Sequence, residues 1–495
     1  MLLYSVNENI WSLNSGIEYA QMLRTKTLQA AGYGAKIVTR DYNRMLSHDV
    51  GTLGLAASDY INMYDYFQQT TAVERVEQHS RLLPQIPLDQ YHVNFVDGEH
   101  STITDPNGLV GVIKMMPGTV GLVGEVVYTD NLQQPLQTEI WDWRGFKSKQ
   151  TMYHPDGQVA VENYLRLDGT VALEVVHMWI NGVVQPTLWH LINYRGQDYN
   201  FTSENELFTF FLNELAGQEL VTFVVDRLSI MPAVTGVTGA LAKYAYFHED
   251  HKYEGGPDLK AEAAAVMALT PSDLDGIIVA TAAQAADVAP YTNLPVQVLP
   301  SASYAPVDNS AQNDDLEYLS YVGRLAPEKQ IIKLIATFAL VHQIAPPARL
   351  RLQGYFVSPA YEQEVRDYIR NNYLDTVVEI WPYNPDTTAL FDHTSMYLSM
   401  SSHEGLNLSV VAAMAHGIPA GVMASTYTVP AVVEDDYNGL VFAAAATPEA
   451  MAQQIIELFL NPSRLVGMQQ AARVKATGYA AAEFVAAWRE MLRIR

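Results

Sequence analysis

Two segments in the second half of the chain carry side chains that could act on a phosphorylated or hydroxylated ligand. Arg324 and Lys329 follow an apolar run. Two cations at this spacing suit a diphosphate, because an arginine fork and a lysine point charge can neutralise phosphate without a metal. Glu404 lies in a polar turn between the apolar run that ends at Met400 and a helix-forming segment that stops at Gly417. A carboxylate there can accept hydrogen bonds from a sugar, while free N–H groups at the helix start attract an anion.

Each of these residues also has a simpler interpretation. Glu404 could merely complement the dipole of the helix that follows it. Arg324 and Lys329, taken singly, are typical solvated surface charges. Glu434 joins them as a third polar group at an expected strand end. Because all of them fall in one expected α/β domain, together they favour a nucleotide-sugar ligand over unrelated surface features.

The first half of the chain contributes three further candidates. His248 and His251 end an apolar strand, with Glu249 and Asp250 between them, and we expect this strand end to face the same cleft. Two alternatives stay open for the histidines: a metal pair, although they lack the helical spacing of HExxH, or two loop histidines with satisfied hydrogen bonds. Gly16 follows the first strand, where it would let a phosphate or sugar approach the backbone or would simply begin a helix.

The composition limits the classes of function. The chain has 495 residues, which predicts two or three domains, and its formal charge of −24 argues against nucleic-acid binding. The absence of cysteine excludes disulfides, thiolate metal sites and a cysteine nucleophile. The opening residues lack the basic and apolar segments of a signal peptide, and no run reaches the length of a membrane span. We therefore expect a cytoplasmic protein with at most peripheral contact at the inner face of the membrane.

The elements that must position these residues follow from the hydrophobic pattern. Residues 1–42 have the pattern of strand, helix and strand, and further buried parallel strands follow between 220 and 300. From about 91 to 193, short alternating runs separated by Asp-Gly and Asn-Gly turns predict an antiparallel β-meander inserted into this first α/β domain. Residues 308–315 are polar and predict a linker to a second α/β domain. The tryptophans of the meander could form a binding surface, but most should pack its core.

Several segments resemble a known family. GRLAPEK at 323–329, SSHEGLNLSVVAAMAHGIP at 401–419 and EDDYNG at 434–439 resemble the C-terminal half of retaining GT-B glycosyltransferases of the family 4 type. The opening NENIWSLNSGIEYAQMLRTKTL, the HEDH at 248–251 and the meander narrow the resemblance, which covers essentially the whole chain. The chain is similar to the catalytic subunit of the accessory Sec system protein O-GlcNAc transferase and to poly(glycerol- or ribitol-phosphate) α-glycosyltransferases.

The resemblance implies an α/β fold of the GT-B type, in which two Rossmann-like domains face a cleft and the first carries the meander. The N-terminal acceptor domain would comprise residues 1–85 and 205–305, and the inserted meander residues 86–204. The C-terminal nucleotide-sugar domain would comprise residues 316–470. A C-terminal helix in 471–495 would pack back on the N-terminal domain.

The resemblance also implies roles for the candidate residues. UDP-GlcNAc or UDP-glucose would lie on the C-terminal domain, with Arg324 and Lys329 on its diphosphate and Glu404 on its sugar hydroxyls. His248 would lie near the reacting sugar, and these four residues form the catalytic set. The substrate-binding set would be Gly16, His251, Gly405, Leu406, Asn407, Leu408 and Ala412.

The resemblance further implies what the reaction needs and which partners it involves. Neither a protein nucleophile, a cofactor nor a metal is required, because the departing phosphate helps to take the acceptor proton. The acceptor would be Ser or Thr of an adhesin-like protein or a teichoic acid hydroxyl, and the acidic surface favours protein. The meander would bind the acceptor or a paralogous glycosyltransferase subunit.

One position departs from the family pattern. The second glutamate, eight residues after Glu404, binds ribose in the family, and here it is Ala412. The loss of hydrogen bonds to a neutral ribose would cost roughly 1–3 kcal/mol of nucleotide affinity. The turn at Gln353 and Gly354 is also less glycine-rich than expected, and an Asn common near the family's HxxH is absent. A non-catalytic partner subunit that stabilises an active paralogue is therefore the alternative. The absence of GxGxxG argues against an unrelated enzyme such as an epimerase.

Overall fold

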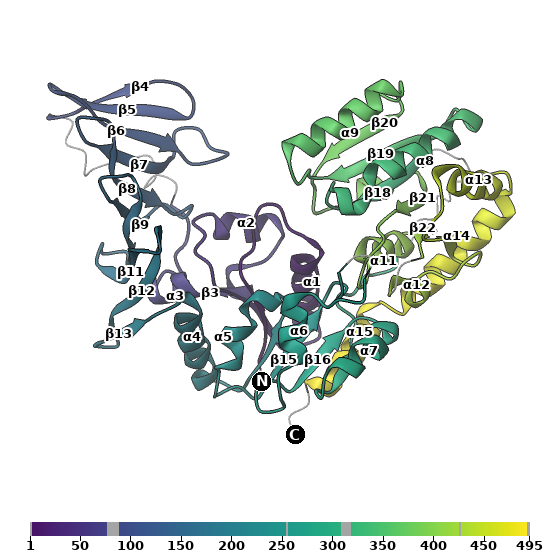
Figure 1. The fold of residues 1–495 in the computed structure, drawn as a ribbon, viewed down its shortest axis with the longest axis horizontal. Coiled ribbons are helices and arrows are strands. Elements are labelled where there is room, and N and C mark those ends of the chain that lie inside the picture. Colours follow the sequence, from purple (N-terminus) through teal and green to yellow (C-terminus); the bar gives the residue numbers. More distant parts are fainter. Residues whose placement is uncertain (1, 77–88, 254–255, 308–317, 425–426, 493–495) are drawn as a thin grey trace.

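The computed structural model contains three β-sheets, two of them parallel and flanked by helices and one antiparallel (Figure 1). The two parallel sheets belong to the two halves of the chain, and the antiparallel sheet extends from the first of them. The predicted linker at 308–315 lies outside the described residues. The described residues are 2–76, 89–253, 256–307, 318–424 and 427–492.

The N-terminal sheet has seven parallel strands, with β1 (Leu2–Asn7) near its centre between β14 and β2. Every residue of β1 and β14 is buried, because helices cover both faces, and this burial explains the continuous apolar runs in the sequence. The other strands are β2 (Gly34–Thr39), β3 (Tyr60–Asn62), β14 (Val221–Val225), β15 (Ala242–Phe247), β16 (Gly276–Val279) and β17 (Val296–Val298). The helices are α1 (Gly16–Ala30), α2 (Leu46–Thr52), α3 (Met63–Gln68), α4 (Glu204–Gln218), α5 (Met231–Thr235), α6 (Ala261–Met267) and α7 (Ala282–Val288).

The middle of the chain forms a ten-stranded antiparallel meander in which each strand pairs with the next, as predicted. The Asn181-Gly182 turn joins two of its strands with φ values of 53° and 81°, the left-handed geometry of a tight hairpin turn. The strands are β4 (His92–Phe95), β5 (His100–Asp105), β6 (Gly108–Met115), β7 (Val123–Thr129), β8 (Pro135–Trp141), β9 (Lys147–Tyr153), β10 (Val159–Leu165), β11 (Val171–Ile180), β12 (Val183–Tyr194) and β13 (Gln197–Phe201).

Three of the four tryptophans in the meander pack its cores, as the sequence predicts. Trp141 and Trp189 are buried, and Trp143 packs against the same cluster as Trp141. Trp179 differs, since it is 56% exposed near the tip of the β11–β12 hairpin.

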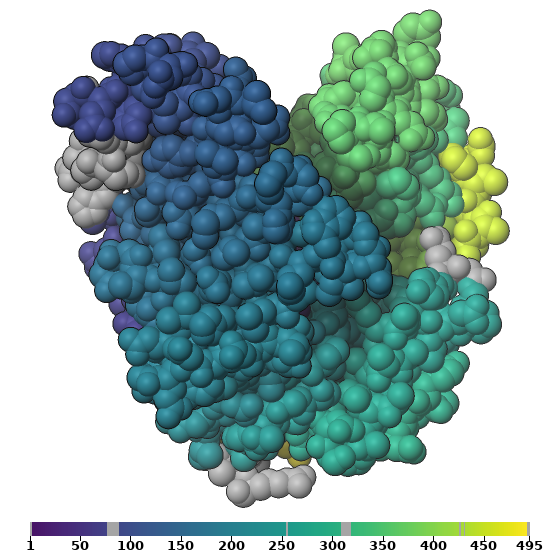
Figure 2. Space-filling view, turned by 60° about the vertical axis from the view of Figure 1, so that its left-hand side comes forward, coloured from purple at the N-terminus to yellow at the C-terminus, as the bar shows by residue number. Residues whose placement is uncertain are grey.

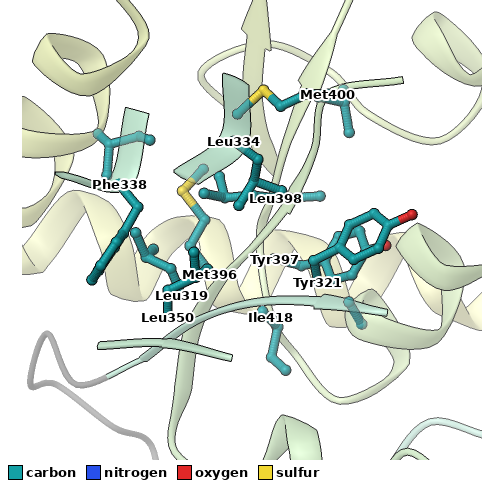
Figure 3. Packing of buried hydrophobic residues seen from close by; sticks show 14 of the residues in the cluster. Leu319, Tyr321, Leu334, Phe338, Leu350, Met396, Tyr397, Leu398, Met400 and Ile418 are labelled. Carbon is teal, nitrogen blue, oxygen red and sulfur yellow. The ribbon is translucent and has the colours of Figure 1, made fainter. Parts of the chain in front are cut away.

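The C-terminal sheet has six parallel strands, with β18 and β21 at its centre. All residues of β21 (Thr394–Ser399) are buried, and Met396 and Leu398 pack with Leu319, Leu334 and Phe338 in the largest core (Figure 3). The other strands are β18 (Tyr318–Val322), β19 (Arg349–Gly354), β20 (Val378–Pro382), β22 (Ala420–Met423) and β23 (Gly439–Phe442). The helices are α8 (Ile331–Ile344), α9 (Pro359–Asn371), α10 (Thr388–Phe391), α11 (Leu408–Ala415), α12 (Thr428–Ala431), α13 (Pro448–Phe459) and α14 (Pro462–Thr477).

The last helix, α15 (Ala481–Met491), packs against the N-terminal sheet rather than the sheet that precedes it in the chain. Phe484 and Trp488 are fully buried there, and the Trp488 indole N–H donates to the Pro300 carbonyl at 2.9 Å. The chain therefore returns to the N-terminal half after it has completed the C-terminal sheet. Within the described residues, no helix has both the length and the apolar character needed to cross a bilayer.

Candidate functional site

A cavity of about 310 Å³ lies between the two parallel sheets, at the carboxyl ends of their strands. The hollow between the green C-terminal half and the blue and teal first half is visible in Figure 2. The start of α1, just after the β1 loop, contributes Gly16, and the loop after β15 contributes His248. From the other side, the loops after β18 and β21 contribute Arg324 and Glu404, and the carboxyl end of β19 contributes Gln353. Ligands of open α/β sheets bind at this edge.

Most of the site residues predicted from the sequence line this cavity. His251 and Gly405 do not, and both are described below. The residues that line it are Gly16, His248, Arg324, Lys329, Glu404, Leu406, Asn407, Leu408 and Ala412. The structure therefore brings together residues from both halves of the chain, such as His248 and Glu404, which lie more than 150 residues apart in sequence.

Glu404 and Lys329 form an ion pair inside the cavity, with 2.6 Å between Oε1 and Nζ. Their side chains are 19% and 18% exposed, so the pair is partly shielded from water. Lys329 ends a 3-10 turn just before α8, whereas Arg324 lies in the preceding loop and makes an exposed 3.3 Å contact with Glu328. An exposed ion pair of this kind contributes at most about 1 kcal/mol, so the Arg324 guanidinium is available to an anionic ligand.

The alternative in which Glu404 only complements a helix dipole is wrong. Helix α11 begins at Leu408, four residues later, and the Asn407 side chain caps it by accepting from the Val410 N–H at 3.3 Å. Glu404 therefore lies in the loop and makes its bond to Lys329. The expectation for Glu434 is also wrong, because this exposed residue precedes β23 instead of ending a strand, and it does not line the cavity.

Two stacked tyrosines hold the loop that carries Arg324. The rings of Tyr321 and Tyr397 are nearly parallel, with centroids 6.3 Å apart, and both lie at the edge of the core (Figure 3). The Tyr321 hydroxyl donates to the Arg324 carbonyl at 2.9 Å, and the Tyr397 hydroxyl donates to the Val322 carbonyl at 3.1 Å. Burial raises the pKa of Tyr397 well above its ordinary value, so it stays a neutral donor.

Three buried polar atoms on residues that line the cavity have no hydrogen-bond partner among the described residues. They are Ser301 Oγ, Gln353 Oε1 and Ser401 Oγ, on residues that are 2%, 3% and 3% exposed. An unsatisfied buried polar group costs about 1–3 kcal/mol, so such atoms mark positions where a bound ligand would complete the hydrogen bonding. Sequence reasoning noted Gln353 only as part of a turn with too few glycines, and it gave Ser401 no role.

A buried polar network holds His248 at the other wall. Its Nε2 lies 2.6 Å from Asp226 Oδ1, and its ring stacks on Tyr246 with centroids 4.1 Å apart. Asp226 is fully buried and also pairs with the buried guanidinium of Arg24, which lies over the ring of Trp488. Burial alone would raise the pKa of the Asp226 carboxyl, but Arg24 and the bond with His248 outweigh it and hold the pKa below its ordinary value. No local sequence pattern pairs Asp226 with His248.

Replacing Asp226 with asparagine should lower the free energy of unfolding by about 3 kcal/mol, because Arg24 would keep its buried charge without a counter-ion. Since the folded-state pKa of Asp226 is depressed, its stabilisation is present above the ordinary value of 3.8 and is lost as the pH falls below it. Thermal unfolding of wild type and Asp226→Asn at pH 7 and below pH 4 measures both effects, and the difference between the two proteins should shrink in acid.

A surface carboxylate supplies the control for this experiment. Asp436 is 65% exposed and pairs with Arg464 at the surface. Asp436→Asn should change stability by less than about 1 kcal/mol. Equal destabilisation by the two variants would contradict a special role for the buried network.

His251 lies behind the cavity instead of in it. Its side chain is fully buried, and burial lowers its pKa despite the nearby Asp250 and Asp287. Neither ring nitrogen has a hydrogen-bond partner among the described residues, and the ring stacks on Tyr427 with centroids 6.0 Å apart. The alternative of a loop histidine with satisfied hydrogen bonds is therefore wrong for His251. The described residues contain no group of three or more His, Asp or Glu side chains placed to hold a metal ion.

The two halves of the chain touch directly at the cavity. Gly405 approaches the His248 backbone so closely that an added Cβ would lie 2.2 Å from the His248 carbonyl oxygen. The Tyr383 hydroxyl lies 2.5 Å from that of Tyr19 and accepts from the Asn14 N–H at 3.4 Å. The cleft is therefore closed in this structure. Sequence reasoning missed Tyr383, since nothing in its local pattern distinguishes it from an ordinary loop tyrosine.

Comparison with known proteins agrees with this architecture. Residues 307–475 match the family model of glycosyl transferases group 1. Over 93% of the chain and 92% of its counterpart, the sequence is 22% identical to the UDP-N-acetylglucosamine–peptide N-acetylglucosaminyltransferase GtfA subunit of Streptococcus agalactiae.

Two solved structures share the fold over nearly their whole lengths. The pneumococcal O-GlcNAc transferase GtfA in complex with UDP and GlcNAc matches with a TM-score of 0.81 and 17% identity, over 99% of this chain and 98% of that one. A TarM mutant of S. aureus in complex with Fondaparinux, alpha-GlcNAc-glycerol and UDP matches with a TM-score of 0.84 and 16% identity, over all of both chains. The fold is therefore that of the GT-B glycosyltransferases, as the sequence predicts.

Proposed function

We propose that this chain, which has the GT-B fold and carries a glycosyl transferases group 1 domain, is a retaining transferase that moves GlcNAc or glucose from a UDP-sugar to Ser or Thr of a cell-surface protein. The observation that carries the proposal is the cavity between the two sheets, with the Lys329–Glu404 pair and Arg324 on one wall and His248 on the other. The enzymes that it resembles in sequence and fold act on UDP-GlcNAc or bind UDP, which supports the donor class.

The proposed donor position follows from the charges and the unsatisfied atoms. The diphosphate lies against Arg324 and Lys329, since these are the cations that line the cavity among the described residues. The sugar lies against Glu404, where its hydroxyls donate to the carboxylate oxygens. Gln353 and Ser401 complete their hydrogen bonding with the nucleotide or its phosphates.

In the proposed reaction, the bond between the anomeric carbon and the β-phosphate oxygen of UDP breaks. The acceptor oxygen bonds to the same carbon from the same face, and the departing phosphate takes the acceptor proton. Arg324 and Lys329 stabilise the negative charge that develops on the phosphate, as fixed charges in a cleft shielded from water do efficiently. We propose that these two cations serve where other transferases use a metal ion.

The direct test is calorimetric titration of UDP and UDP-GlcNAc into the purified chain, followed by measurement of UDP release with and without EDTA. We expect micromolar binding and slow UDP release that EDTA leaves unchanged. Loss of release in EDTA would overturn the metal-free proposal. Absence of binding at millimolar nucleotide would overturn the proposed donor site.

Ala412 is the weak point of the proposed nucleotide site. It lines the cavity from helix α11 and offers only a methyl group where the family's glutamate would bind ribose. Ala412→Glu should tighten UDP binding by roughly 1–3 kcal/mol, or one to two decades in Kd. Titration of UDP into both proteins measures the change, and Ala412→Gln separates hydrogen bonding from charge. An unchanged Kd in both variants would show that ribose does not lie against this position.

The same position favours a second candidate function, that of a partner subunit which binds acceptor and stabilises an active paralogous transferase. The relative from S. agalactiae is itself described as a subunit. Under this function the chain binds acceptor protein without releasing UDP, and it raises the activity of a co-purified transferase. Under the first function the purified chain releases UDP by itself.

A further inference from the structure

A second cavity, of about 170 Å³, adjoins the donor cavity on the side of the N-terminal sheet. Ser15, Glu249, Arg324 and Tyr355 line both cavities, so the two adjoin each other beside Arg324. The remaining wall comes mainly from the loop after β1. A group bound in the second cavity would therefore lie beside the donor cavity.

The loop after β1 presents two large apolar side chains at this second cavity. Trp11 is 51% exposed and Leu13 is 46% exposed, and both line it. Large apolar side chains that meet at a cleft mark a contact surface. This cavity therefore offers an aromatic and an aliphatic contact that the donor position does not use.

Hydrogen bonds hold the backbone of this loop, although these side chains are exposed. The Asn14 side chain accepts from the Trp11 N–H at 3.1 Å and donates back to the Trp11 carbonyl at 2.5 Å. Ile10 is buried in a neighbouring core, and its carbonyl accepts from the Asn43 side chain at 3.0 Å. An exposed tryptophan on a fixed backbone loses little entropy on binding, so it suits recognition of a ligand.

The charges around this cavity disfavour a polyanion. Arg227 is tied to Glu18 at 2.6 Å, and Arg324 faces the donor diphosphate. Glu8 and Glu249 add two carboxylates to the wall. Partial desolvation would raise the pKa of Glu249, but Lys260, Arg227 and Arg324 hold it below its ordinary value, so it stays ionised. A phosphodiester polymer would meet these carboxylates, whereas an uncharged chain would not.

We propose that the second cavity is the acceptor subsite and that it takes an extended, uncharged polypeptide segment. Trp11 and Leu13 contact the side chains that flank the acceptor Ser or Thr, and Glu249 excludes phosphodiester polymers. The proposal rests on the proposed function for its reaction but concerns binding, so it can be measured without turnover.

The experiment measures binding of a fluorescent, uncharged peptide rich in Ser and Thr by anisotropy, with UDP present, in wild type, Trp11→Ala and Trp179→Ala. Trp179 is the matched control, because it is 56% exposed but lies on the meander hairpin. We expect Trp11→Ala to weaken peptide binding roughly 10- to 30-fold, as loss of an aromatic anchor does, and Trp179→Ala to leave it unchanged. Thermal unfolding of each variant verifies that it is folded.

Other results would contradict the proposed acceptor subsite. Weaker peptide binding only in Trp179→Ala would place the acceptor on the meander. Equal peptide binding in all three proteins would show that Trp11 does not contact the peptide. Competition between poly(glycerol phosphate) and the peptide would show that the cavity binds a polyanion. Peptide binding that depends on Trp11 in a chain that never releases UDP supports the subsite and contradicts only the proposed reaction.

Discussion

Glu404→Gln should reduce sugar transfer by roughly 100-fold or more while UDP remains bound, because loss of one preorganised polar contact to the reacting group typically costs that much. Glutamine keeps the size of the side chain but removes the charge that attracts sugar hydroxyls and pairs with Lys329 at 2.6 Å. Lys329 loses a competing partner, so its attraction for the diphosphate should be equal or stronger. In wild type, the ion pair links the residue that contacts the sugar to the residue that contacts the diphosphate. The variant therefore tests sugar recognition separately from phosphate binding.

UDP release with acceptor present measures the loss of transfer, and calorimetry measures UDP affinity. Glu434→Gln is the matched control, since it removes an exposed carboxylate of the same half of the chain outside the cavity, and it should behave as wild type. Full transfer by Glu404→Gln would show that the donor sugar lies elsewhere. A parallel loss of UDP binding would show that Glu404 acts mainly by orienting Lys329.

Gly405→Ala should abolish most transfer by holding the cleft open. An added Cβ would lie 2.2 Å from the His248 carbonyl oxygen and 2.8 Å from its carbonyl carbon, so the two halves would have to separate. The contacted atoms are backbone atoms, which cannot rotate away as a flexible side chain could. Because a shift of about 1 Å between reacting groups can cost 100-fold in rate, a loss of that order is expected.

Two measurements distinguish an open cleft from an unfolded protein. The proposed UDP contacts lie on the C-terminal half, so UDP affinity should persist, and small-angle scattering with UDP-sugar should show a larger radius of gyration than for wild type. Gly467→Ala is the control, because Gly467 is exposed in α14 and an added Cβ would meet nothing within 4 Å. Wild-type transfer by Gly405→Ala would show that the cleft does not need this approach for catalysis.

The sequence by itself was sufficient for the architecture and for one wall of the site. Continuous apolar runs predicted the parallel strands, because strands covered on both faces need no polar residues. Turn signals such as Asn181-Gly182 predicted the meander, because few residue pairs adopt that turn. Arg324, Lys329 and Glu404 were predicted together, since each follows a strand, and the carboxyl ends of parallel strands meet at one edge.

Only the tertiary structure determined which groups face each other across the cleft. The pairing of Asp226 with His248, the approach of Gly405 to the His248 backbone and the contact of Tyr383 with Tyr19 all join distant parts of the chain. No local pattern encodes such contacts, because they depend on how two separately packed sheets are oriented. His251 shows the same limit: it is three residues from His248 in the sequence, yet the chain turns it into a buried position behind the cavity. The sequence therefore showed which strand ends carry charged and polar residues. The packing of the two halves determined which of those side chains line the cavity.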